Sequence, residues 1–277
     1  MDANHPETLL PDRHRALFLS DLHLGTAGSR SDLVLDFLKA NTADSIFLIG
    51  DIFDVWHPLL VRWTVAEQRI VDLLRQRVAE GSRLIYLHGN HDDAYLTERC
   101  ASVLKHQIAL PVVPLARTVH VMEDGRQLLV LHGDVCDARA LRFHLLTRLG
   151  SRIDSLLVLA DVALRKLRIA FGPQGRGPFK LILSGINDLI YRKRSHERRL
   201  VALARDMGLE GVICGHFHIA AIHDDHGPLY VNCGDWVDSF TAVVETQDGR
   251  LLLVGAGGAE NRSKARYAPP ISVGGAV

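Results

Sequence analysis

The sequence lacks several features that mark specialised classes of protein. Its 277 residues contain no run of about 18 uncharged apolar residues, so no membrane-spanning helix is expected. The first 15 residues carry acidic side chains and no apolar core, so a secretory signal peptide is not expected either. No CxxC pair and no internal repeat occur. This favours a cytoplasmic protein with reduced thiols at Cys100, Cys136, Cys214 and Cys233.

An excess of one charge is also lacking, because 32 Lys/Arg balance 32 Asp/Glu. The two signs are nevertheless unevenly placed. Residues Arg139 to Arg199 contain 14 Lys/Arg and four Asp/Glu, a net charge of +10, which leaves −10 for the rest of the chain. A basic segment in an otherwise acidic chain suggests an anionic partner, although a solvated helical surface would give the same composition.

Short apolar runs rich in Val, Ile, Leu and Phe predict strands that are buried on both faces. They occupy residues 16–20, 45–50, 84–89, 128–133, 211–215, 229–234, 240–246 and 250–255. Helical spacing lies between several of them, at 31–41, which begins with a capping Ser, and at 63–81, which ends in Gly. This alternation predicts an α/β architecture, and the short turns between the closing strands predict antiparallel hairpins.

Residues 138–207 differ from the rest, because amphipathic helical patterns at 141–171 and 179–208 replace the alternation. We therefore expect one domain over residues 1–277, with a helical cap inserted at 138–207. The Pro/Gly-rich residues 257–277 predict a flexible tail.

Five of the apolar runs end in Asp, Asn or His side chains. In open α/β sheets, sites form at the carboxyl ends of strands, so the five groups should converge on one edge. Buried carboxylates and imidazoles cost several kcal/mol each unless they are paired or bind metal. The groups are Asp21 and His23; Asp51 and Asp54; Asn90, His91 and Asp92; His132, Asp134 and Asp137; and His216 and His218.

Mixed Asp, His and Asn ligands suit borderline divalent ions such as Mn²⁺, Fe²⁺, Zn²⁺ or Co²⁺. The set is large enough for two ions, with one Asp as a bridge. Two ions about 3.5–4 Å apart clamp the attacking and leaving oxygens of a phosphoryl transfer and generate a hydroxide near neutral pH. The pattern therefore predicts a two-metal phosphoesterase.

The ordered motifs SDLH, GDIFD, GNHD, HGD and GHFH resemble those of the calcineurin-like metallophosphoesterases, and they span residues 21–218. The resemblance implies an αββα fold, a β-sandwich flanked by helices. It implies that one metal is held by Asp21, His23, Asp51 and His218. It assigns the other metal to Asp51, Asn90, His132 and His216.

His91 does not match a ligand position. The resemblance implies that it meets the phosphate and protonates the leaving oxygen, with Asp54 as its orienting partner. A general acid built from a His held by a carboxylate agrees with this. Asp92, Asp93 and Asp134 are expected to brace loops beside the site.

The motifs SDLHLG, GDIFDVW, HGDVCD and NCGDW, with a helical insert after HGD, resemble the UDP-2,3-diacylglucosamine diphosphatase group of lipid A synthesis. That resemblance implies a lipid-linked nucleotide substrate, release of UMP, and Mn²⁺ in preference to Fe, Zn, Co or Mg. The best-characterised members carry Arg where this chain has His91, and a branch with GNHD is closer. Expected substrate-binding residues are Asn90, His91, Asp137, Arg139 and Arg142.

Three other interpretations stay open. The same metals could serve a phosphodiesterase or phosphomonoesterase with another substrate. The basic segment could bind nucleic acid, but single-strand binding needs aromatic residues among the basic ones, and only Phe143, Phe171, Phe179 and Tyr191 occur there. A non-catalytic metal protein is the third. The basic helices could also lie on an anionic membrane surface, which would make a cytoplasmic protein peripheral to the inner membrane. Nothing in the sequence indicates an oligomeric state.

Overall fold

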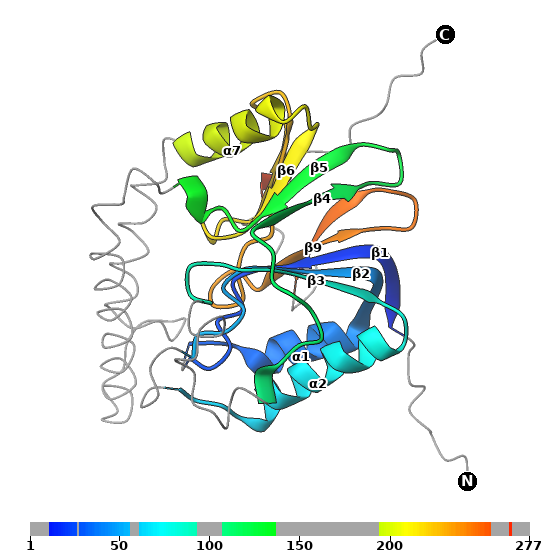
Figure 1. Ribbon diagram of the computed structural model, residues 1–277, viewed down its shortest axis with the longest axis vertical. Helices are drawn as coiled ribbons and strands as arrows, with labels where there is room; N and C mark the ends of the chain where they lie inside the picture. Colours follow the sequence, from blue (N-terminus) through cyan, green and yellow to red (C-terminus); the bar gives the residue numbers. More distant parts are fainter. Residues whose placement is uncertain are drawn as a thin grey trace.

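The computed structural model describes residues 11–26, 28–55, 61–92, 107–136, 194–255 and 266–267. Within these residues, two β-sheets lie face to face, as Figure 1 shows. Helices α1 (Ser31–Ala40) and α2 (Val65–Ala79) cover the outer face of one sheet, and α7 (Ser195–Asp206) covers the other. The predicted αββα arrangement is therefore confirmed.

The first sheet has the strand order β10-β9-β1-β2-β3. Its centre is parallel, because β1 pairs with β2 and β2 with β3 in the same direction, while β9 runs antiparallel to both β1 and β10. The parallel strands all end at the same edge. The strands are β1 (Asp12–Leu19), β2 (Asn41–Ile49), β3 (Arg83–Leu87), β9 (Thr241–Glu245) and β10 (Leu251–Gly255).

The second sheet has the order β11-β7-β8-β6-β5-β4. Strands β5, β6 and β8 are mutually parallel, whereas β4 and β7 are antiparallel to their neighbours β5 and β8. The strands are β4 (Arg117–Val121), β5 (Gln127–Leu131), β6 (Gly211–Cys214), β7 (Ala221–His223), β8 (Leu229–Asn232) and β11 (Arg266–Tyr267).

All eight predicted strands form, with ends that differ from the expected ones by a few residues. The hairpin predicted for the last two strands is confirmed as the antiparallel pair β9–β10. The turn at 224–228 instead joins β8 to the unpredicted antiparallel strand β7, and the predicted strands β6 and β8 are parallel. Strands β4, β7 and β11 were not predicted. The sequence of β4, "RTVHV", alternates between exposed and more buried side chains, so it carries no continuous apolar run.

Apolar side chains fill three layers. The middle layer lies between the sheets and includes Phe18 and Phe47, whose stacked rings lie 4.7 Å apart. One outer layer joins the first sheet to α1 and α2, and the other joins the second sheet to α7. Both faces of the central strands are thereby buried, as their continuous apolar runs predicted.

Helix α2 begins at a capping box in which the Glu67 carboxylate accepts the backbone N–H of Thr64 at 2.8 Å. It ends before Gly81, whose φ of +106° suits glycine, as predicted. The prediction that a Ser caps the helix at 31–41 is wrong. Arg30 occupies the N-cap position, and Ser31 is the first helical residue. The buried Ser31 hydroxyl instead donates to Glu67 at 2.7 Å, because packing against α2 offers it a better acceptor.

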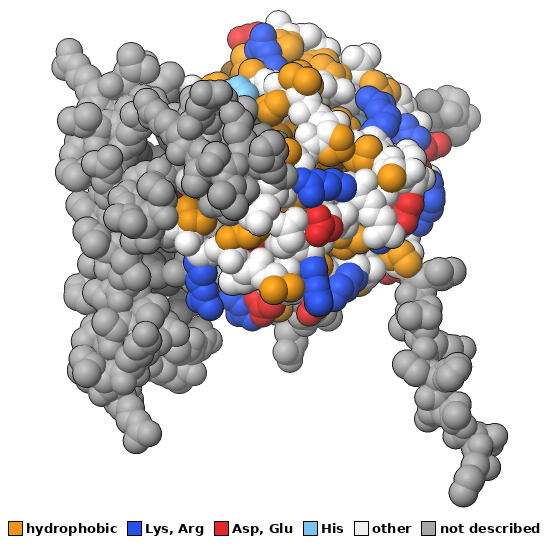
Figure 2. Space-filling model, turned by 60° about the horizontal axis from the view of Figure 1, so that its bottom comes forward, with side chains coloured by type: hydrophobic (Ala, Val, Ile, Leu, Met, Phe, Trp, Pro, Cys, Tyr) orange, Lys and Arg blue, Asp and Glu red, His pale blue; other side chains and the backbone are white. Residues whose placement is uncertain are grey.

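The helical insertion predicted at 138–207 is described only where α7 forms. Its remaining part lies outside the described residues, as do the candidate residues Asp137, Arg139 and Arg142. Of the tail predicted at 257–277, only β11 (Arg266–Tyr267) lies within the described residues. None of the described helices combines the length and the apolar character needed to span a bilayer. On the face shown in Figure 2, basic and acidic side chains are interspersed, which fits ion pairs such as Asp72–Arg75 on α2.

Candidate metal centre

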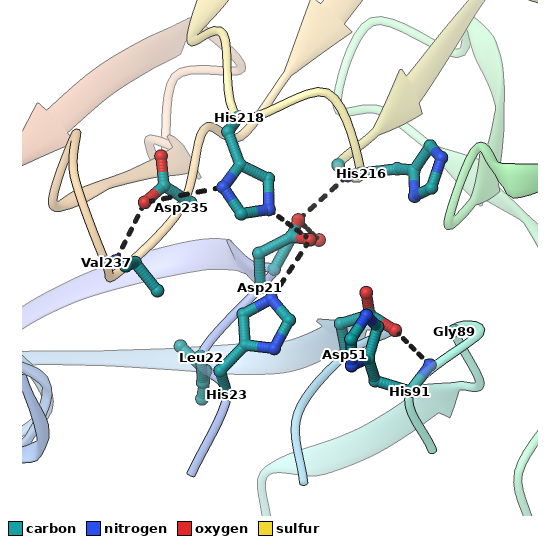
Figure 3. A network of polar contacts seen from close by, with 12 residues as sticks. Asp21, Leu22, His23, Asp51, Gly89, His91, His216, His218, Asp235 and Val237 are labelled. Carbon is teal, nitrogen blue, oxygen red and sulfur yellow. Dashed lines mark hydrogen bonds and ion pairs between the residues drawn. The ribbon is translucent and has the colours of Figure 1, made fainter. Parts of the chain in front are cut away.

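The predicted polar groups converge at the carboxyl ends of the parallel strands. Asp21 and His23 follow β1, Asp51 follows β2, and His91 follows β3. His132 follows β5, and His216 and His218 follow β6. Figure 3 shows residues from both sheets facing one another across this edge. The site thus lies where the two sheets of the sandwich meet.

The backbone turns sharply at five of these positions, because their φ angles are positive. The values are 54° at Asp21, 46° at His23, 54° at Asp51, 67° at His216 and 55° at His218. A non-glycine residue pays about 1–3 kcal/mol for such a conformation, which persists only where the surroundings enforce it. The strain is therefore concentrated on the residues that face the site.

Neighbouring glycines leave no room for a side chain. A Cβ atom at Gly89 would lie 2.2 Å from Asp51 Oδ1, and one at Gly215 would lie 1.8 Å from the Ser20 hydroxyl. These contacts are far shorter than real side chains allow. Glycine at both positions therefore lets two backbone segments approach the carboxylates directly.

Histidine and carboxylate atoms gather in three clusters, in each of which the candidate ligand atoms lie within 4.8 Å of one another. The Asp21 cluster has His218 Nε2 at 3.2 Å from Asp21 Oδ1. The Asp51 cluster has His132 Nε2 at 3.3 Å from Asp51 Oδ2. The clusters consist of Asp21, His23 and His218; of Asp51, His132 and His216; and of His23, Asp54 and His91.

The donor atoms suit divalent cations. Among the described residues, Asp21 Oδ1 and His132 Nε2 are buried atoms without a hydrogen-bond partner. His132 Nδ1 lies 2.9 Å from the Ile49 carbonyl oxygen, to which it donates, so in the neutral ring that a metal requires the lone pair is on Nε2. Two carboxylates and four imidazoles in the Asp21 and Asp51 clusters form a set that Mn²⁺, Fe²⁺, Zn²⁺ or Co²⁺ accepts. The residues present therefore fit divalent metal ions.

A second layer of hydrogen bonds fixes these carboxylates. Asp21 Oδ2 accepts the Ser20 hydroxyl at 2.6 Å and the backbone N–H of His216 at 2.8 Å. Asp51 Oδ1 accepts the backbone N–H of His91 at 2.8 Å. Asp92 accepts four backbone N–H groups at 2.8–3.0 Å, those of Asp51, Ile52, Phe53 and Gly89.

The charges stabilise one another in the metal-free protein. Burial alone would raise the pKa of Asp21, but His218 and His132 reverse the effect and lower it to about 2. Burial would lower the pKa of His91, but Asp51 and Asp54 raise it to about 9. In the same way, Asp235 and Asp21 raise the pKa of His218 to about 10. Burial together with the Asp51 charge raises the pKa of Asp92 to about 6.

The predicted acid pair also comes together. His91 Nδ1 lies 3.2 Å from Asp54 Oδ2, and His23 Nδ1 lies 3.4 Å from the same oxygen. Asn90 is exposed, and its side chain makes no hydrogen bond within the described part of the chain. Cys214 and Cys233 are buried but belong to none of the three clusters.

Sequence reasoning missed Ser20 and Asp235. The carboxylate of Asp235 is fully buried, accepts the backbone N–H of Val237 at 2.8 Å, and lies 3.8 Å from His218 Nδ1 (Figure 3). A carboxylate behind a metal-binding His is a common orienting arrangement. The NCGDW motif contains Asp235, but its spacing alone does not reveal which histidine it meets.

The αββα sandwich and the His/Asp clusters at its strand ends define a metallophosphoesterase. The chain belongs to the calcineurin-like phosphoesterase family, whose model matches residues 14–220. It is accordingly a hydrolase of phosphate esters or anhydrides, and the family resemblance seen in the sequence is confirmed.

Several relatives share one name. The chain is similar to the UDP-2,3-diacylglucosamine hydrolase of Tolumonas auensis, with 33% identity over 129 residues, 43% of this chain and 46% of that protein. The hydrolase of the same name from Pseudomonas fluorescens is 25% identical over 252 residues, 85% of this chain and 94% of that one. Among solved structures, a phosphoesterase from E. coli aligns with 87% of this chain and 98% of its own, at 16% identity and a TM-score of 0.38.

Proposed function

We propose that this protein is a two-metal hydrolase that cleaves the pyrophosphate of UDP-2,3-diacylglucosamine, or of a similar lipid-linked nucleotide. The products would be UMP and a lipid phosphate. The observation that carries the two-metal part is the presence of two neighbouring His/carboxylate clusters, one at Asp21 and one at Asp51. They are linked by His216, a member of the Asp51 cluster whose backbone N–H donates to Asp21 Oδ2 at 2.8 Å, and Asp51 is the proposed bridge. The names of the relatives support the substrate.

Seven side chains would hold the metals. One ion would take Asp21, His23, Asp51 and His218, and the other would take Asp51, Asn90, His132 and His216. Two divalent ions bound there would supply Lewis acidity and a water that ionises near neutral pH. We favour Mn²⁺ over Fe, Zn, Co or Mg. Ser20, Asp92 and Asp235 would orient these ligands through the contacts described above.

His91 would act as the general acid. Asp54 Oδ2 accepts a hydrogen bond from His91 Nδ1–H at 3.2 Å, which leaves the Nε2–H to be donated to the leaving oxygen. The His91 side chain is 23% exposed, so it can reach a substrate. The carboxylate of Asp54 is shared with His23, which ties the acid to the neighbouring metal cluster.

The insertion at 138–207 would form a cap for the acyl chains, and its basic residues would meet the phosphates. Asn90, His91, Asp137, Arg139 and Arg142 are the proposed substrate contacts. Arg is well suited to this task because its planar guanidinium matches phosphate geometry. We further propose a cytoplasmic protein whose basic helices rest on the anionic inner membrane surface.

The test compares two substrates. Metal-free protein is reloaded with Mn²⁺ and offered UDP-2,3-diacylglucosamine or bis(p-nitrophenyl) phosphate. The expected result is release of UMP from the lipid, lost in Asp51→Asn. Cleavage of the aryl diester alone would keep the hydrolase and refute the lipid substrate. His91, which stands where the best-characterised diphosphatases carry Arg, would then be the first residue to examine for another substrate.

A further inference from the structure

Helix α7 touches the loop that carries two of the proposed metal ligands. We propose that His196, in the first turn of α7, is a positioning residue that holds this loop in its metal-binding conformation. The loop comprises residues 215–218 and carries His216 and His218. The inference rests on the proposed metal site and assigns His196 no direct contact with metal or substrate.

A series of ring contacts connects α7 to the Asp51 cluster. The ring of His196 stacks on Phe217 with centroids 4.1 Å apart and an interplanar angle of 30°. Phe217 meets His216 edge-on at 5.0 Å, and His216 meets His132 in the same way at 5.0 Å. His216 and His132 are both proposed ligands of one metal. A displacement of Phe217 would therefore reach that metal directly.

The loop needs such support because its backbone is strained. His216 and His218 both have positive φ angles, 67° and 55°, on either side of Phe217. Conformations of this kind persist only where surrounding contacts enforce them. Backbone hydrogen bonds supply part of the restraint, from His216 N–H to Asp21 at 2.8 Å and from Phe217 N–H to the Gly215 carbonyl at 2.8 Å.

The Phe217 side chain supplies the rest, since only 3% of the residue is exposed. The ring stacks on His196 and also lies close to Gly133. A Cβ atom added at Gly133 would lie 3.3 Å from the Phe217 ring and 3.4 Å from the Cβ of His216. The ring therefore has little room to move unless His196 is removed.

His196 itself is fixed independently of the loop. Its carbonyl oxygen accepts the Cys136 thiol at 3.9 Å, and Arg199 on the next turn donates to the Cys136 carbonyl at 3.0 Å. Arg194, just before the helix, pairs with Glu197 at 2.6 Å and Asp225 at 2.7 Å. Leu200, Val201 and Ala204 anchor the helix in the apolar layer over the second sheet. The first turn of α7 is thus a firm base for the stack.

The test measures metal affinity as well as turnover. His196→Ala removes the stack, His196→Phe keeps it, and His120→Ala is a matched control. His120 is a similarly buried His that contacts Phe18 and Phe47 in the middle layer, away from the site. Full-length, metal-free proteins are titrated with Mn²⁺ by following the electron paramagnetic resonance signal of the free ion. The unfolding temperature of each metal-free protein is recorded in parallel.

We expect His196→Ala to bind at least one Mn²⁺ ion about 10–100-fold more weakly, the usual effect of losing an orienting contact. His196→Phe should bind as the wild type does. His120→Ala should lose thermal stability and keep its metal affinity. Unchanged affinity in His196→Ala would overturn the inference, and so would a His196→Phe variant as weak as His196→Ala. Wild-type protein that binds no Mn²⁺ would instead refute the metal site itself.

Discussion

The carboxylates of Asp51 and Asp92 each accept a backbone N–H from the turn that carries the other residue. Asp92 Oδ2 accepts the backbone N–H of Asp51 at 2.8 Å, while Asp51 Oδ1 accepts the backbone N–H of His91 at 2.8 Å. Asp92 also binds three further N–H groups and is fully buried. One carboxylate thereby holds the turn after β2 and the turn after β3 at a fixed separation.

Replacing Asp92 by Ala should therefore destabilise the protein. Four backbone N–H groups would lose their acceptor, and we expect the free energy of unfolding to fall by about 2–4 kcal/mol. Urea denaturation of the metal-free protein measures this. Asp92→Asn keeps one acceptor oxygen and should lose less. Equal stability of the Ala variant and the wild type would show that the carboxylate does not hold these turns.

The pairing of His91 with Asp54 predicts an effect that depends on the leaving group. Removal of a general acid typically slows a reaction about 10²–10⁴-fold. We expect His91→Ala to show this loss in kcat with a nucleotide diphosphate substrate, and a smaller loss with an aryl diester. A nitrophenolate leaves readily without a proton, which is the reason for the difference. Asp54→Asn should lie between the wild type and His91→Ala.

Equal losses on the two substrates would contradict proton donation by His91 and point to a role in binding. A change in KM with an unchanged kcat would likewise indicate that His91 binds the substrate and does not donate a proton. Metal content of each variant should be measured beside the kinetics, because Asp54 also contacts His23.

Without metal, the protein should become less stable as pH rises from 7 to 10. The folded-state pKa values of His91 and His218, about 9 and about 10, are raised above the ordinary value of 6.5. A raised pKa contributes stability that is complete below pH 6.5 and is lost as pH rises through the folded-state pKa. The metal-free protein should thus unfold at lower temperature at pH 10 than at pH 7.

The measurement is a thermal unfolding series from pH 6 to pH 10 in a chelating buffer. His218→Gln is the matched variant, and it should flatten part of the decline. A metal-free wild type whose unfolding temperature stays constant across this range would refute the proton-linked contribution.

Removal of a second buried carboxylate, that of Glu245, should lower stability without lowering activity. Glu245 on β9 is fully buried and meets His120 of β4, Arg15 of β1 at 3.2 Å and the Glu123 N–H at 2.8 Å. It lies beside Ala16, in the middle of β1, whereas the proposed metal ligands Asp21 and His23 follow the end of that strand.

Glu245→Ala leaves His120 and the Glu123 N–H without this acceptor, so the free energy of unfolding should fall by about 2–4 kcal/mol. At a temperature where the variant is folded, kcat and Mn²⁺ affinity should match those of the wild type. A changed Mn²⁺ affinity would mean that the contacts of Glu245 are coupled to the proposed metal site.

Much of this structure could be predicted from sequence because the site residues follow strands with strong apolar runs. Asp21, Asp51, His132 and His216 each end such a run, so their convergence follows from parallel pairing. Strand β4 was missed because its side chains alternate, and β7 because it has only three residues.

The supporting contacts depend on tertiary packing and could not be predicted in this way. Ser31 looked like a helix cap, but a neighbouring helix provides a competing acceptor in Glu67. Asp235 reaches His218 only because the turn after β8 folds back beside the loop after β6. Neither the Ser31–Glu67 contact nor the Asp235–His218 contact corresponds to a recognisable residue spacing in the sequence.

The hydrogen bond from His216 to Asp21 joins residues 195 positions apart in the chain. The Asp21 cluster therefore cannot be completed early in synthesis. Its last member, His218, is translated after the three parallel strands of the first sheet, β1 to β3, and after helices α1 and α2. Contacts of such long sequence separation slow folding because a large loop must be closed before they form. Until then, the Asp21 cluster would lack His218 and the Asp51 cluster would lack His216, and metal capture would mark the completion of the native fold rather than its beginning.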